Sequence, residues 1–151
     1  MRFFRYIFLI VLVFLGVVFL FTLKKDSRTQ KIFLAGKPLK VEIRKTSAGR
    51  EKGLSDRENL CSDCGMFFVF DQTGIYTFWM KRMRFDVDIL WIAGDRVVDI
   101  TYGAKAPSGE DFEAPRERYS SKAPINKVLE VNAGWVKKNG IGVGDKMSAN
   151  Y

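Results

Sequence analysis

The sequence predicts a small, mainly β domain behind a single transmembrane helix. Short runs rich in Val, Ile, Phe and Trp recur at close spacing along most of the chain, and only two brief stretches show helical spacing. Many short strands with few helices are typical of a sandwich or barrel. We therefore expect a β-rich α+β domain, a small antiparallel sandwich or barrel with two short helices. The transmembrane helix is predicted by 18 consecutive uncharged residues, 6–23.

The uncharged run, YIFLIVLVFLGVVFLFTL, is long enough to cross a membrane as a helix. It would extend roughly 27 Å, close to the hydrocarbon thickness of about 30 Å. A cleaved signal peptide is the alternative, but its apolar region is usually about 7–15 residues long and ends at a small-residue cleavage site. The LKKD that ends the run offers no such site. We expect an uncleaved anchor over residues 1–25 that contacts membrane lipid through residues 6–23.

The net charge of +8 is concentrated beside the membrane segment. Residues 1–40 contain eight basic residues and one acidic residue, whereas residues 41–151 contain 17 basic and 16 acidic residues. The folded part therefore has no surplus of positive charge for a nucleic-acid-binding surface, and we expect no nucleic-acid partner. Basic residues that flank a membrane segment instead act as orientation signals or as contacts to anionic lipid.

Opposing signals bear on the orientation of the domain. The Lys and Arg count on each side of the membrane segment favours a cytoplasmic domain under the positive-inside rule. The very short N-terminal tail and the cysteine pair Cys61 and Cys64 favour the opposite orientation. We expect a single-pass protein of the cytoplasmic membrane whose domain lies on the outer face, in the cell envelope.

The first half of the domain is expected to place one short helix between strands. Residues 26–37 hold a linker and a first short strand, and residues 38–151 form the β-rich domain. A polar stretch with weak helical spacing has Ser47 as its candidate N-cap and Gly53 as its end. The continuous apolar run MFFVF predicts a core strand, and a turn at 71–74 predicts a hairpin with the strand that follows. The strands expected in this half are residues 32–34, 39–43, 66–70 and 76–81.

The second half is expected to add a hairpin, a long loop and a short helix. The turn of the hairpin is Ala93-Gly94-Asp95. Residues 103–126 contain three prolines and many charges and are expected to be a loop. Asn132 is the candidate N-cap of a short helix over 133–139, with Gly140 in the C′ position. The strands expected in this half are residues 88–92, 96–102, 127–131 and, closing the sheet, 146–148.

The chain contains no histidine, which removes the commonest general base and the commonest metal ligand. The Cys-x-x-Cys sequence at Cys61 and Cys64 has three interpretations: a structural disulfide, which we favour, a pair of free thiols, or a redox or metal-binding pair. A thioredoxin-like pair lies at a helix N-terminus, whereas this pair precedes a predicted strand. A zinc site needs four ligands, which two cysteines do not supply alone. We expect no metal and no cofactor.

Six polar and aromatic residues in or beside the predicted strands are candidates for a ligand cleft. Charges set in apolar strands are costly unless they pair with each other or are held for a ligand. We hypothesise that these side chains converge on one cleft, with Trp79 as its apolar wall. The alternative interpretation is a structural ion-pair network in which Asn132 caps a helix. The candidates are Arg57, Trp79, Lys81, Asp88, Glu130 and Asn132.

Two kinds of chemistry fit such a cleft. In a binding site, Trp79 or Trp135 stacks on a sugar while acids and amides bind its hydroxyl groups. In an enzyme, Asp88 and Glu130 form an acid and base pair, as in glycoside hydrolysis, which needs two carboxyl groups about 5 to 9.5 Å apart. Aromatic residues in strands are more often core than sugar platforms, and nothing in the sequence selects a substrate.

Blocks of residues spread along the domain resemble the family catalogued as domain of unknown function 192. The likeness covers roughly residues 38–148, and its most specific parts are FWMK and VLEVNAG. The chain has Val87 where the family usually has Pro, and cysteines at 61 and 64 where many members have other residues. The blocks are GL at 53–54 with Arg57 and Leu60, GMFFVF at 65–70, FWMK at 78–81, DVDI at 86–89, VLEVNAG at 128–134, GI at 140–141 and GD at 144–145.

The resemblance implies a compact, mostly β domain, often exported or tethered to a membrane, and it implies no reaction. We therefore expect a membrane-anchored, extracytoplasmic module of the cell envelope that binds an unidentified ligand or protein and is not catalytic. One alternative is a small envelope hydrolase that uses Asp88 and Glu130. A further alternative is a structural subunit of a membrane complex, which contacts its partners through the anchor and the loop at residues 103–126.

Overall fold

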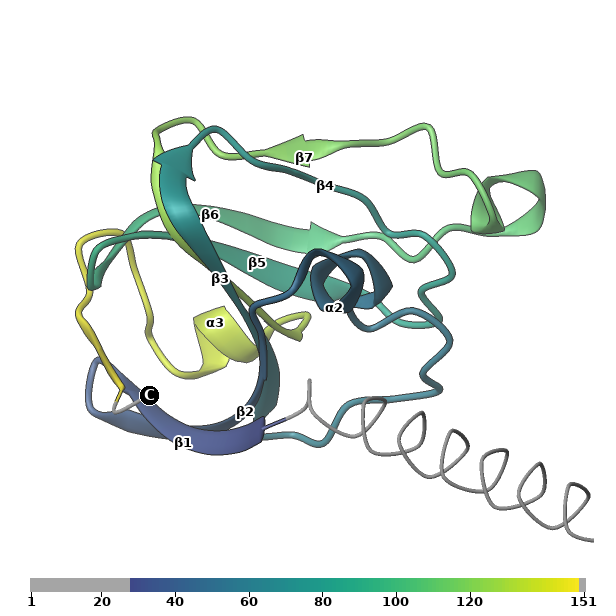
Figure 1. The fold of residues 1–151 in the computed structure, drawn as a ribbon. Coiled ribbons are helices and arrows are strands. Elements are labelled where there is room, and N and C mark those ends of the chain that lie inside the picture. The colour runs from purple at the N-terminus through teal and green to yellow at the C-terminus, as the bar shows by residue number, and fades with distance from the viewer. Residues whose placement is uncertain (1–27, 150–151) are drawn as a thin grey trace, which may run out of the picture.

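The computed structural model describes residues 28–149 (Figure 1). This part of the chain forms a mainly β fold with two short α-helices and one turn of 3-10 helix. Its elements are β1 (Arg28–Leu34), β2 (Lys37–Arg44), α2 (Ser47–Lys52), β3 (Cys64–Gly74), β4 (Thr77–Phe78), β5 (Val87–Ala93), β6 (Arg96–Ala104), η1 (Gly109–Phe112), β7 (Tyr119–Ser120), β8 (Ile125–Asn132), α3 (Trp135–Lys138) and β9 (Met147–Ala149).

Seven of the strands form one curled sheet in the order β6-β5-β8-β3-β2-β1-β9. Its two edges meet, because Arg96 at the start of β6 forms an isolated antiparallel bridge with Lys146, just before β9. The backbone N–H of Val97 donates to the carbonyl oxygen of Asp145 at 3.0 Å in the same place. The sheet is therefore a half-barrel whose open side is closed at one point. Strands β4 and β7 pair separately as a two-stranded ribbon.

The concave face of the sheet holds one hydrophobic core, which Figure 1 shows wrapped around α3. Trp135 and Val136 of α3 pack there against apolar side chains from all seven strands of the sheet. The strand residues of this core alternate with outward-facing ones, as the period of two in a strand requires. They include Ile32, Leu34, Leu39, Val41, Phe67, Leu90, Ile92, Leu129 and Val131.

The convex face of β3, β5 and β8 holds a second core. The loop after α2, the residues around β4, and β7 cover this face. These three strands are thus buried on both faces, which is why β3 and β5 contain the continuous apolar runs MFFVF and ILWI rather than alternating sequences. The second core includes Leu54, Met66, Phe68, Met80, Met83, Ile89, Trp91 and Val128.

The expected mainly β class with two short helices is confirmed, and two details of the topology differ. Strands β2 and β3 run parallel, because the 19 residues between them, with α2, are long enough to carry the chain back to the same end of the sheet. The expected hairpin of MFFVF with residues 76–81 is wrong. The two neighbours of β3 in the sheet are β2 and β8, and β4 pairs with β7 instead.

The segment predicted to be the membrane anchor, residues 6–23, lies outside the described residues. Within residues 28–149, no helix has the length and hydrophobicity needed to cross a bilayer. The loop expected over 103–126 contains η1 and β7, the latter placed by its pairing with β4.

Candidate functional site

The structure distributes the six candidate residues over four places. Trp79, Lys81 and Glu130 line one pocket on the convex side of the sheet. Asp88 lies on the concave side, at the start of α3. The other two are close to the cysteine turn but face away from the pocket: Arg57 binds a carboxylate on β2, and Asn132 binds backbone carbonyls. The structure therefore brings three of the six together in one pocket and places the other three elsewhere.

The pocket has a volume of about 260 Å³ and lies between α2, the residues around β4, and the outer surface of β3 and β8. Its walls are mainly aromatic. Phe70 stacks on Tyr76 with ring centroids 3.7 Å apart, and Phe68 meets Phe78 edge to face at 5.0 Å. These contacts brace the rings of the pocket walls against one another. The apolar side chains that line the pocket are Leu54, Phe68, Phe70, Tyr76, Phe78, Trp79 and Met83.

Glu130 is the buried ionisable group of this pocket. Its neighbours across β3 and β5 are Met66 and Ile89, both fully buried. Glu130 itself is 5% exposed, and its side chain has no hydrogen bond or ion pair with any other residue in the described range 28–149. Burial raises the pKa of this carboxyl from 4.5 to about 8. At neutral pH the group is therefore mainly a neutral acid, with one donor and one acceptor available to a ligand.

The rim of the pocket is basic. Arg50, Lys52 and Lys81 line it together with one acid, the exposed Glu51. The Lys81 ammonium lies 5.5 Å from the centroid of the Trp79 ring, and the Arg118 guanidinium lies 4.9 Å from the same centroid. These are distances at which cations and aromatic rings attract one another.

Arg50 is the fixed member of the rim. Its guanidinium donates to the carbonyl oxygen of Lys45 and, at 3.1 Å, to that of Val69. It also lies 5.0 Å from the centroid of the Phe70 ring. Arg50 therefore anchors α2 to β3 at the edge of the pocket.

Asp88 is a structural acceptor. One carboxylate oxygen accepts the backbone N–H groups of Gly134 at 2.9 Å and Val136 at 3.2 Å, and the other accepts that of Gly103 at 2.9 Å. Gly134 is the N-cap residue of α3 with φ of 84°, a left-handed conformation that costs glycine little. Its N–H points at Asp88 in that conformation, so Asp88 performs the capping that the sequence assigned to Asn132. That expected cap is wrong.

Asp88 and Glu130 face opposite sides of the sheet. Ile89 is the partner of Glu130 across the β5–β8 ladder, and Asp88 is the partner of Val131. Neighbouring residues of a strand point to opposite faces, so the sheet separates the two carboxyl groups. They share no space in which a substrate could meet both, and the acid and base pair of the hydrolase hypothesis is not formed by these residues.

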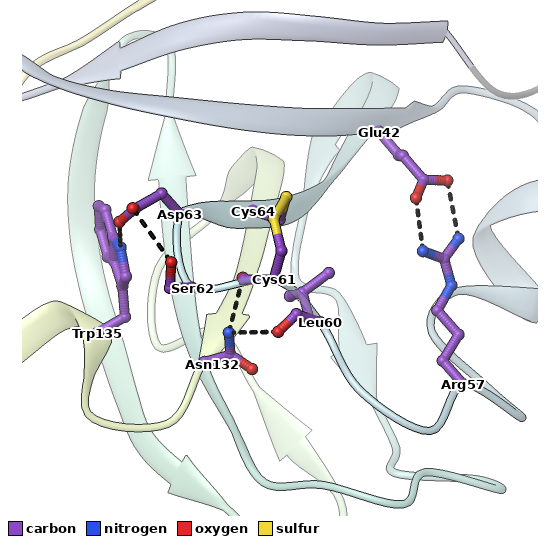
Figure 2. Close-up of a disulfide and its surroundings, with 9 residues drawn as sticks. All are labelled: Glu42, Arg57, Leu60, Cys61, Ser62, Asp63, Cys64, Asn132 and Trp135. Atoms are coloured by element: carbon purple, nitrogen blue, oxygen red, sulfur yellow. Dashed lines mark hydrogen bonds and ion pairs between the residues drawn. A yellow bond between two sulfur atoms is a disulfide. The ribbon is translucent and has the colours of Figure 1, made fainter.

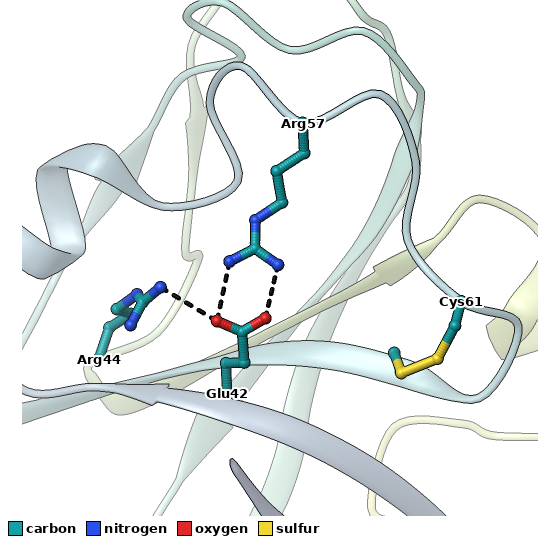
Figure 3. A network of polar contacts seen from close by, with 5 residues as sticks. Glu42, Arg44, Arg57 and Cys61 are labelled. Carbon is teal, nitrogen blue, oxygen red and sulfur yellow. Dashed lines mark hydrogen bonds and ion pairs between the residues drawn. A yellow bond between two sulfur atoms is a disulfide. The ribbon is translucent and has the colours of Figure 1, made fainter. Parts of the chain in front are cut away.

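Arg57 belongs to an ion-pair cluster on β2 (Figure 3). Its two terminal nitrogens bind the two oxygens of Glu42 at 2.5 and 2.8 Å, a bidentate geometry. Arg44 reaches the same carboxylate at 3.1 Å. Hydrogen bonding to Glu42 raises the pKa of Arg57. The cluster ties the loop after α2 to β2, which is the role that the ion-pair interpretation assigned to Arg57.

Cys61 and Cys64 form a disulfide, the favoured one of the three interpretations (Figure 2). The bond closes a turn in which the N–H of Cys64 donates to the carbonyl oxygen of Cys61 at 3.1 Å. The Asn132 amide donates to the carbonyl oxygens of Leu60 at 3.1 Å and Cys61 at 2.9 Å. The end of β8 thus holds the cysteine turn in place. Trp135 does not reach the pocket; it is buried in the concave core.

Sequence reasoning missed most of the pocket walls and the fixed cation of its rim. Alternation along MFFVF places Phe68 and Phe70 on one face of β3, but aromatic residues in a strand indicate core, and here one face of the core is incompletely covered. The basic residues of α2, Arg50 and Lys52, carry no signal in the sequence, because their place over β3 depends on a chain crossover.

Comparisons with known proteins agree with this fold. The sequence model of domain of unknown function 192, described as an uncharacterized ACR, matches residues 30–149. No curated protein matches the chain. A crystal structure of a candidate transcription regulator from Sinorhizobium meliloti is 29% identical, with a TM-score of 0.73 over 83% of this chain and 96% of that chain. A protein of unknown function from Novosphingobium aromaticivorans is 28% identical, with a TM-score of 0.70 over 80% of this chain and 85% of that chain.

Proposed function

The chain belongs to the family of domain of unknown function 192, and from that premise we propose that it is a non-catalytic ligand-binding module, anchored in the cytoplasmic membrane with its domain in the cell envelope. The observation that carries the proposal is Glu130. A carboxyl group that is 5% exposed and has no partner among the described residues is costly to keep in an apolar core. A ligand that hydrogen-bonds to it recovers that cost.

The walls around Glu130 support binding. Concave sites lined by apolar and aromatic side chains with a few polar groups are the usual form of small-molecule sites. Here the aromatic walls are braced by their own ring contacts, so little ordering is needed when a ligand enters. Binding without catalysis is favoured because the floor of the pocket has one ionisable group, Glu130, whereas Glu51 is exposed at the rim.

The proposed place in the envelope rests on two features. The uncharged residues 6–23 have the length of a membrane-spanning helix. The Cys61–Cys64 disulfide is a bond that forms and persists in oxidising compartments outside the cytoplasm. Both features favour a tethered domain on the outer face of the membrane.

A role in transcription is not carried over from the Sinorhizobium meliloti protein. Residues 41–151 of this chain have 17 basic and 16 acidic residues, and binding to DNA depends on a concentrated positive charge.

The experiment is a thermal-shift screen of the full chain, purified in detergent, against sugars, peptidoglycan fragments, peptides, nucleotides and divalent metals. A ligand at 100 times its Kd adds about 2.7 kcal/mol of stability, which is readily seen as a higher Tm. We expect a stabilising ligand whose effect is lost in Lys81→Ala and retained in Lys37→Ala, a lysine that does not line the pocket.

Three results would contradict the proposal. Silence across the panel argues against a binding module. A shift that is unchanged in both Lys81→Ala and Glu130→Gln places the ligand elsewhere. Conversion of the bound ligand to a product, followed by mass spectrometry, argues against a non-catalytic role.

A further inference from the structure

We propose that the pocket over Glu130 selects a small organic anion: a single-ring molecule, aromatic or sugar, with one carboxylate. This inference rests on the proposed binding function and adds the charge and size of the ligand to it.

The size follows from the volume of the pocket. About 260 Å³ is the space of about nine water molecules at roughly 30 Å³ each. One monosaccharide or one substituted aromatic ring fits that space, whereas a peptide or an oligosaccharide extends beyond it. The ring contacts of Phe68, Phe70, Tyr76 and Phe78 leave the walls little freedom to widen.

The sign of the ligand charge follows from the rim. Three cations and one anion line the entrance. The side chains of Lys52 and Lys81 have no ion pair with any residue of the described part of the chain, so their charges are available to a ligand. A mouth with one dominant charge concentrates ligands of the opposite sign. An anion is therefore attracted, and a cation is repelled.

The aromatic faces at the rim do not call for a cation. An electron-rich ring face attracts a cation, but these faces already have protein cations beside them. Lys81 and Arg118 lie within 6 Å of the Trp79 centroid, at 5.5 and 4.9 Å, and Arg50 lies 5.0 Å from that of Phe70. A cationic ligand gains less here than in an aromatic cage built without basic residues.

The floor accepts an anion because Glu130 is neutral when the pocket is empty. A neutral carboxyl group donates a hydrogen bond to a carboxylate, whereas an ionised one repels it. The groups around Glu130 are Arg50, Glu51 and Lys52 from α2, Tyr76 before β4 and Lys81 after it; the facing residues of β3 and β5 are the apolar Met66 and Ile89.

The test uses ligands that share a scaffold and differ in charge. One series is phenylacetate, phenylacetamide and phenethylamine; the other is glucuronate, glucose and glucosamine. Each is titrated into the detergent-solubilised full chain at pH 7 by calorimetry. We expect the anionic member of at least one series to bind at least about fivefold tighter than both of its relatives.

Two outcomes overturn the inference and separate it from the proposed function. Tighter binding of a neutral or cationic member overturns the preference for anions and leaves a binding module. No binding by any member also overturns the inference. The broader thermal-shift screen then tests separately whether the protein is a binding module.

Variants and pH test whether Glu130 and Lys81 cause the preference for an anion. With a pKa of about 8, about nine tenths of Glu130 is neutral at pH 7 and about one tenth at pH 9, so affinity for the anion falls about tenfold between them. Glu130→Gln cannot ionise and should remove this fall. Lys81→Met should weaken the anion severalfold, and Lys37→Met should not. An affinity that rises with pH, or that Lys81→Met leaves unchanged, contradicts the inference.

Discussion

Asp88 and Glu130 lie on adjacent strands, one step apart in the β5–β8 ladder, and their side chains point to opposite faces of the sheet. Both are buried, at 1% and 5% exposed. Asp88 accepts three backbone N–H groups, whereas Glu130 has no partner among residues 28–149. The same functional group thus stabilises the fold on one face of the sheet and lines a pocket on the other.

Replacing Asp88 by Ala should destabilise the fold by roughly 3 kcal/mol, because it leaves three N–H groups without an acceptor and one of them, on Val136, is buried. Urea unfolding followed by circular dichroism measures the loss. Asp86→Ala is the matched control: it also removes an acceptor of a backbone N–H, that of Ala106 at 2.8 Å, but Asp86 is more exposed, so its loss should be smaller. Equal losses would contradict the role given to Asp88.

The stability of the protein should fall as pH rises from about 5 to 8. Burial raises the pKa of Glu130 to about 8 in the folded state from 4.5, so the folded chain holds a proton that the unfolded chain has released. The stabilisation is complete below 4.5 and is lost as pH rises through 8, with a slope on the order of 1 kcal/mol per pH unit.

Urea unfolding at four pH values checks this slope, and Glu130→Gln should flatten it. Asp86 does not disturb the window, because its hydrogen bond with Lys105 lowers its pKa below 3.8, so it stays ionised in both states above pH 5. Parallel slopes in the wild type and in Glu130→Gln would assign the pH dependence to other groups.

Arg57→Lys should cost about 1 kcal/mol, because a lysine cannot reproduce the bidentate contact with Glu42. Both side chains of this pair are partly shielded, at 31% and 24% exposed. Arg84→Lys is the control, since its pair with Glu58 is 3.3 Å long and both side chains are exposed; it should have no measurable effect. Chemical unfolding measures the free energy of unfolding of both variants. A larger loss of stability in Arg84→Lys than in Arg57→Lys would contradict this account.

Reducing the Cys61–Cys64 disulfide should lower stability by about 2 kcal/mol, the loop-closure value for a four-residue loop. The fold should survive, because the Asn132 amide still holds the carbonyl oxygens of Leu60 and Cys61. Unfolding with and without reductant, with thiol counting by mass spectrometry, measures the effect. Loss of the circular dichroism spectrum on reduction alone would show that Asn132 is not sufficient.

The sequence predicted the strands best where burial is greatest. The predicted strands 66–70, 88–92 and 127–131 all lie within strands that are covered on both faces, β3, β5 and β8. The pairing of strands was predicted less well. Hydrophobicity does not distinguish β8 from β4 as the neighbour of β3, and the parallel β2–β3 pair depends on a crossover that no local pattern encodes.

The candidate site was predicted in part for a related reason. Alternation relates side chains within one strand, but the faces chosen by Asp88 and Glu130 depend on the register between two strands. A shift of one residue would have placed both carboxyl groups on the same face. Trp79 and Lys81 follow the two-residue strand β4, and the carbonyl oxygen of Lys81 accepts a hydrogen bond from the Ser55 hydroxyl at 2.8 Å, so their place beside Glu130 arises from tertiary packing.

The pairing of β1 with β9 has a consequence for the order of events in biosynthesis. Residues 32–34 find their partners at 147–149, so the barrel is completed only after nearly the whole domain has been synthesised. Contacts between such distant segments slow folding, because the chain loses the entropy of closing a long loop before these stabilising contacts form. Until β9 pairs with β1, the outer edge of β1 stays open, so the contacts that complete the sheet are expected to form last.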